Sequence, residues 1–81
     1  MTTEDMLRSF IVDELRWDRG ESLPSDYPLL TNGVVDSLGI LSLVSFIEST
    51  FGVQILDEEL VPEHFETVAS IAGLIDAKVA A

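Results

Sequence analysis

The stretch Gly33–Phe51, which reads GVVDSLGILSLVSFIESTF, decides the fold of this chain. Asp36 is a typical helix N-cap, because its carboxylate can accept hydrogen bonds from the first unpaired backbone N–H groups of a helix. Ser37 is then the first helical residue, and its hydroxyl lies beside those N–H groups and the positive end of the helix dipole. A phosphate ester on Ser37 would therefore be stabilised electrostatically.

The helix that begins at Ser37 is expected to end at about Phe51, because Gly52 suits the left-handed position that terminates helices. One stripe of this helix is apolar and is assigned to the core: Ile40, Leu43, Val44, Ile47 and Phe51. A second stripe mixes leucines with small polar residues and is assigned to the exposed side: Leu38, Leu41, Ser42, Ser45, Glu48 and Ser49. We call these six residues the partner face, because two exposed leucines would need a partner to be buried.

The segments before Gly33 predict one helix and a long connection. Residues 3–17 carry apolar side chains at helical spacing, and Thr2 or Thr3 can cap this helix. Trp17 is expected to cover the end of the core. The connection over residues 18–35 is too apolar for a loose linker, and we expect it to fold back on the helices with Leu29 and Leu30 as anchors.

The segments after Gly52 predict two more helices. Residues 53–56 form an extended connector, and Asp57 caps a short helix that runs to Val61 and ends at Pro62. Residues 63–66 are expected to form a turn with Phe65 buried. Thr67 then caps a last helix with apolar residues at helical spacing from Val68 onward. Three long helices and one short third helix predict an all-α, four-helix bundle, with residues 1–81 as a single domain.

The composition limits the function. Fifteen acidic residues against four Lys and Arg give a formal charge of −11, which argues against binding to nucleic acid and favours basic protein partners. Cysteine is absent, so any thiol chemistry must come from an added group. The sequence has no apolar run long enough to span a membrane and no basic leader at its start. We therefore expect a cytoplasmic monomer.

The chain offers little for catalysis of its own. A serine triad needs a histidine, and the single one, His64, falls in the predicted turn. The acidic residues near it lack the alternating oxygen ligands and central glycine of a calcium loop, so no metal site is expected: Asp57, Glu58, Glu59, Glu63 and Glu66. No phosphate-binding glycine loop or dinucleotide fingerprint occurs. We expect no catalytic residues and no enzyme.

The order Asp36-Ser37-Leu38, then an apolar helix, then Phe51-Gly52-Val53 resembles the attachment motif of the acyl carrier protein family. The resemblance covers nearly the whole chain and agrees with the helix order derived above. It implies that Ser37 carries 4'-phosphopantetheine, transferred from coenzyme A by a phosphopantetheinyl transferase. The terminal thiol would hold acyl or aminoacyl groups as thioesters, and Asp36 would support the attachment site as the helix cap.

The resemblance also implies the class of partners. The partner face would meet the transferase, an adenylate-forming ligase or acyltransferase that loads the arm, and a downstream synthase or transferase. Fatty-acid-synthase carriers show several acids on this helix, whereas here Glu48 is the only acid on the partner face. The chain looks more like a stand-alone acyl, aminoacyl or D-alanyl carrier, as in secondary metabolism. Two alternatives stay open: an unmodified helical adaptor that binds through the same face, and an acidic mimic of nucleic acid.

Overall fold

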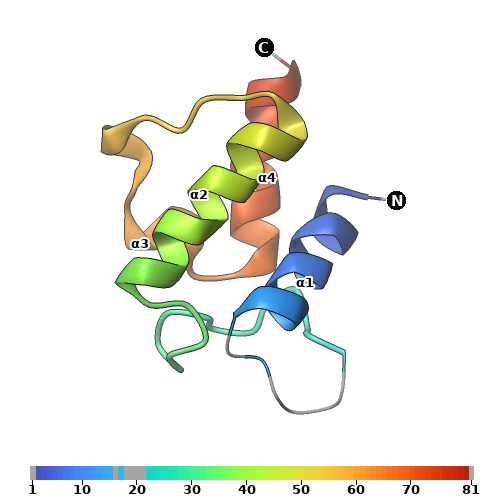
Figure 1. The fold of residues 1–81 in the computed structure, drawn as a ribbon, viewed down its shortest axis with the longest axis vertical. Coiled ribbons are helices and arrows are strands. Elements are labelled where there is room, and N and C mark those ends of the chain that lie inside the picture. Colours follow the sequence, from blue (N-terminus) through green and yellow to red (C-terminus); the bar gives the residue numbers. More distant parts are fainter. Residues whose placement is uncertain (1, 16, 18–21, 81) are drawn as a thin grey trace.

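The computed structural model describes residues 2–15, 17 and 22–80, and in these residues the chain is all-helical (Figure 1). The helices are α1 (Thr3–Glu14), α2 (Ser37–Phe51), α3 (Pro62–Phe65) and α4 (Val68–Ala80), with a single 3-10 turn, η1, at Asp57–Glu59. The described residues hold no helix that is both long and apolar enough to cross a membrane. The predicted all-α bundle is confirmed, with three long helices and short helical turns before the last one.

Helix α1 begins where its sequence predicts and ends sooner. Thr2 and Asp5 form a reciprocal cap, with the Asp5 N–H 3.1 Å from the Thr2 hydroxyl and the Thr2 N–H 3.4 Å from the Asp5 carboxylate. These hydrogen bonds with Thr2, backbone first, hold the pKa of Asp5 below its ordinary value. The helix stops at Glu14 rather than at residue 17, since Leu15 already has extended backbone angles. Trp17 is buried, as expected.

Helix α4 is the element around which the others pack, because it contacts α1, α2 and α3. Its hydroxyl cap is confirmed: the Ser70 N–H donates to the Thr67 hydroxyl at 3.0 Å, and the Thr67 N–H donates to the Ser70 hydroxyl at 3.1 Å. Phe65 lies just before it and is buried. The fully buried side chains from all four helices meet here: Leu7, Ile11, Leu43, Ile47, Phe65, Val68, Ile71 and Ile75.

The prediction for residues 57–66 is wrong in its placement of the short helix. Asp57 does not cap a helix that ends at Pro62; the 3-10 turn closes at Glu59, and Pro62 is the first residue of α3. Proline is suited to that position, because its fixed φ fits a helix and its missing N–H is not needed there. The turn is held from outside by Lys78 of α4, whose ammonium lies 2.7 Å from the Glu59 carboxylate.

Residues 22–35 of the long connection before α2 form a packed segment, as their apolar side chains predict, and residues 18–21 of the predicted connection lie outside the described residues. Leu29 is completely buried and Leu30 is half-buried. The Leu29 N–H donates to the Glu66 carbonyl at 2.7 Å, and the Val34 N–H returns to the Leu29 carbonyl at 2.9 Å. Gly33 makes this return turn with a positive φ of 74°, which glycine adopts without strain. The connection thus reaches α2 in a fixed orientation.

Candidate functional site

The start of α2 has the geometry that its sequence predicts. Asp36 has extended backbone angles, and its carboxylate accepts the Gly39 N–H at 2.8 Å. The helix runs from Ser37 to Phe51 and closes on Gly52, whose φ of 69° is left-handed. Both ends of α2 are therefore fixed by single local residues.

Ser37 is exposed, and within the described residues its hydroxyl makes no hydrogen bond. The capping function belongs to Asp36, so the hydroxyl of Ser37 is not needed to hold the helix together. It lies at the N-terminal turn of a 15-residue helix, where unpaired N–H groups favour an anionic group. Ser37 can therefore accept a phosphate ester without the loss of a structural contact.

Glu66 is the residue that anchors the approach to this site, and the sequence analysis missed its function. Its carboxylate accepts hydrogen bonds from the Leu30 N–H at 2.9 Å, the Thr31 N–H at 3.2 Å and the Thr31 hydroxyl at 2.8 Å. These hydrogen bonds, led by the Thr31 hydroxyl, lower the pKa of Glu66. No local pattern could reveal this, because the partners are 35 and 36 residues away in the sequence.

The partner face carries the most exposed large apolar side chains of the described chain. Leu38 is 74% exposed and Leu41 is 62% exposed. Ser42, Ser45 and Ser49 are also exposed, and the Ser49 hydroxyl donates to the Ser45 carbonyl at 3.0 Å. The structure brings these five residues to one side of α2, away from Leu43 and Ile47 in the core.

Glu48 differs from the other five residues of the partner face. It is half-buried, and its carboxylate accepts the Ile55 N–H at 2.9 Å. Glu48 therefore fixes the connector after α2, and one of its carboxylate oxygens is already used inside the molecule. The exposed part of the partner face has no charge: two leucines and three serines.

His64 lies outside this site. It is half-buried on α3, and its Nδ1 lies 2.9 Å from the Glu59 carbonyl oxygen. Phe65, its neighbour, faces the core. This contact holds η1 against α3. His64 is far from Ser37 in the sequence.

Comparison with known proteins finds similarity to a solved structure. No model of a known protein family matches the chain. A solved structure named "Crystal structure of FAD-dependent dehydrogenase" contains a chain that is 39% identical, with a TM-score of 0.77. The match covers 85% of this chain and 97% of the matched chain, so the two are of similar length.

The two chains belong to one family. At this identity, over nearly the full length of the matched chain, the small all-helical fold is shared between them. The dehydrogenase activity in the name of the matched structure is stated for that structure alone.

Proposed function

We propose that the chain is a carrier protein that holds acyl or aminoacyl groups on a 4'-phosphopantetheine arm attached to Ser37. The observation that carries this proposal is the Ser37 hydroxyl, which is exposed at the first turn of α2 while Asp36 caps the helix. A serine hydroxyl that is not used as the helix cap, at a position that favours a phosphate, can serve as an attachment site. The order of residues around it resembles that of the acyl carrier protein family.

The attachment is a phosphoryl transfer. An O–P bond forms between the Ser37 Oγ and the phosphate next to pantetheine, and the O–P bond to the adenosine bisphosphate of coenzyme A breaks. The hydroxyl proton goes to a base of the separate transferase, and adenosine bisphosphate leaves. The arm supplies a thiol, which this cysteine-free chain lacks, for thioester formation. The protein fixes the attachment point and raises the effective concentration of the carried group at each docked enzyme.

The exposed partner face and the name of the matched structure support the proposed partners. A loading ligase or acyltransferase and a downstream synthase are proposed as in the carrier family, in a secondary-metabolite or aminoacyl-transfer pathway. The matched structure is named for a FAD-dependent dehydrogenase. A dehydrogenase of this kind is proposed as a separate partner, which takes a proton and a hydride from the carried group and reduces its flavin.

The experiment is an intact mass measurement. The protein is incubated with coenzyme A, magnesium and a broad-specificity phosphopantetheinyl transferase, beside Ser37→Ala and the matched control Ser9→Ala, an exposed serine of α1 outside the partner face. We expect the mass of one phosphopantetheine on the wild type and on Ser9→Ala, and none on Ser37→Ala. No mass gain on the folded wild type would refute the carrier function. The exposed Leu38 and Leu41 would then favour the unmodified adaptor.

A further inference from the structure

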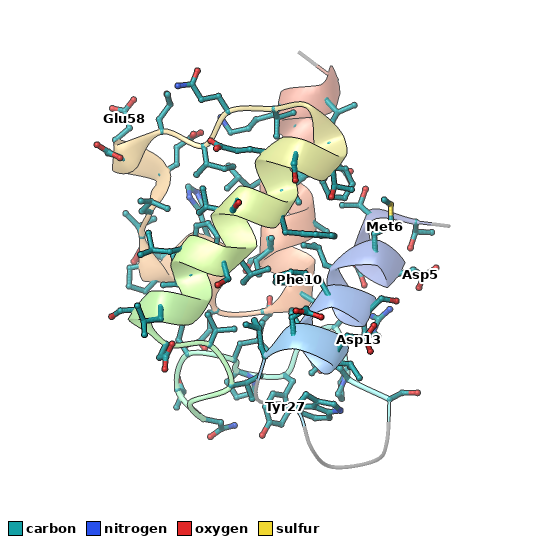
Figure 2. All side chains as sticks on the ribbon, viewed as in Figure 1. Asp5, Met6, Phe10, Asp13, Tyr27 and Glu58 are labelled. Carbon is teal, nitrogen blue, oxygen red and sulfur yellow. The ribbon has the colours of Figure 1, made fainter. Side chains whose placement is uncertain are left out.

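A groove runs along the surface between α1 and α2, beside the partner face. Its volume is about 400 Å³, and it is open to solvent along its length. Its lining comes from two residues of α1 and four of α2: Phe10, Glu14, Ser42, Ser45, Phe46 and Ser49. Figure 2 labels Phe10 where α1 faces α2. Three serines of the partner face thus form one wall of this groove.

Two aromatic rings form the apolar part of the groove. The rings of Phe10 and Phe46 are stacked, with their centroids 4.4 Å apart and an angle of 21° between their planes. The rings of Phe51 and Phe46 form a T-shaped pair with centroids 6.2 Å apart, so Phe51 supports the stacked pair from the end of α2. Phe10 and Phe46 are only half-buried, so part of their surface remains available to a ligand.

The polar side chains of the groove suit a ligand group that donates hydrogen bonds and carries a positive charge. Glu14 supplies the only charged group among the six lining residues, and it is a carboxylate. The Ser49 hydroxyl donates to the Ser45 carbonyl, whereas the hydroxyls of Ser42 and Ser45 bond no described residue. An anion would be repelled here, while an ammonium would be attracted by Glu14 and by the faces of the aromatic rings.

The groove lies within reach of an arm on Ser37. Ser42 and Ser45 follow Ser37 by five and eight residues, which is roughly 7–12 Å along the helix axis. Because each helical residue turns by about 100°, Leu38 and Leu41 lie between the arm's attachment point and the groove. Extended phosphopantetheine is about as long as five or six extended residues, roughly 18–20 Å. Its end can therefore cross the two leucines and deliver the carried group to the groove.

We infer that the α1–α2 groove holds the group carried on the Ser37 arm and selects an aminoacyl group over an acyl group of the same size. Glu14 attracts the ammonium, the serine hydroxyls bind the neighbouring carbonyl and amide groups, and Phe10 with Phe46 covers the hydrocarbon part. This inference rests on the proposed function, and it makes the carried substrate an amino acid. The carried group would leave the groove when an enzyme docks on the partner face.

The test uses the whole chain loaded with two groups that differ by one ammonium. The transferase attaches the arm from alanyl-coenzyme A or from propionyl-coenzyme A at pH 6.5, where an α-amino group of pKa about 7.7–8 is protonated. Intact mass confirms loading, so an absence of mass gain refutes the proposed function and is seen before the groove is measured. Two-dimensional NMR spectra then compare the loaded forms with the chain that carries the unloaded arm.

We expect the signals of Phe10, Phe46, Ser42 and Ser45 to shift at least twice as far in the alanyl form as in the propionyl form. Glu14→Gln should remove this difference. Asp13→Asn, which removes the same charge from an exposed position of α1 outside the groove lining, should keep it. Equal shifts in both loaded forms, shifts confined to the first turn of α2, or a difference that survives Glu14→Gln would each overturn the inference.

Discussion

Two leucines of α2, separated by a single residue, allow stability and function to be tested apart. Leu43 is completely buried in the core, and Leu41 is 62% exposed on the partner face. Leu43→Ala and Leu41→Ala remove the same atoms from the same helix and change its intrinsic helix propensity equally. Any difference between the two variants therefore reports the surroundings of each side chain.

The magnitudes follow from burial. Truncation of a fully buried leucine loses its transfer free energy and leaves a cavity, so Leu43→Ala should cost about 2–5 kcal/mol. Leu41 keeps roughly two fifths of its surface covered, and complete burial of a leucine is worth about 1.5–3 kcal/mol, so Leu41→Ala should cost less than about 1 kcal/mol. In a domain of this size about 1 kcal/mol shifts the melting temperature by roughly 4–8 °C. The two costs differ by at least about 1 kcal/mol, so the two variants should melt at least about 4 °C apart.

The assay is thermal unfolding by circular dichroism, followed by the transferase reaction below the melting temperature of both variants. Leu43→Ala should melt early and, while folded, accept the arm at the wild-type rate. Leu41→Ala should melt within about 8 °C of the wild type and accept the arm more slowly, because the proposed docking of the transferase would bury Leu41. Equal melting temperatures for the two variants would refute the assignment of the two sides of α2.

Three further predictions concern single polar groups. Asp36→Ala should cost about 1 kcal/mol in thermal unfolding, because the Gly39 N–H loses its cap; an unchanged melting temperature would refute the capping function. Glu48→Gln keeps an oxygen for the Ile55 N–H, so its melting temperature and its transferase rate should stay near those of the wild type; a fivefold slower rate would show that a partner contacts the carboxylate. The pKa values of Asp5, Glu59 and Glu66 are lower in the folded chain than their ordinary values, so protonation favours unfolding. Stability should be full above about pH 4.5, the ordinary glutamate pKa, and fall as the pH drops through the lowered values. Glu66→Gln should weaken this dependence in melting curves between pH 6 and pH 3.5; an unchanged slope would contradict it.

The sequence predicted the elements whose signals are local. Asp36 and Gly52 set the two ends of α2 through contacts within their own turns, and the reciprocal cap of Thr67 and Ser70 sets the start of α4. The alternation of buried and exposed positions along α2 follows the helical period, which the residue types display directly.

What the sequence did not predict depends on contacts between distant residues. Pro62 can end one helix or begin another. Here it begins α3, after a turn whose Glu59 pairs with Lys78 of α4, a contact that no local pattern displays. The anchor that Glu66 provides for Leu30 and the bond from the Ile55 N–H to Glu48 are of the same kind. In each case an acidic side chain that looked like surface charge is used to fix a connection.

This use of acidic side chains changes what the net charge of −11 means for recognition. A field of that size attracts positive surfaces from a distance and speeds encounter. At contact, however, the exposed part of the partner face offers Leu38, Leu41 and three serines, because Glu48 is half-buried and bonded to Ile55. A partner that docks there gains most from an apolar surface matched to the two leucines, and a cation placed opposite them would lose its hydration without a carboxylate in return. Under the proposed function, charge would bring partners to this chain, and apolar contact beside Ser37 would decide which of them remain bound.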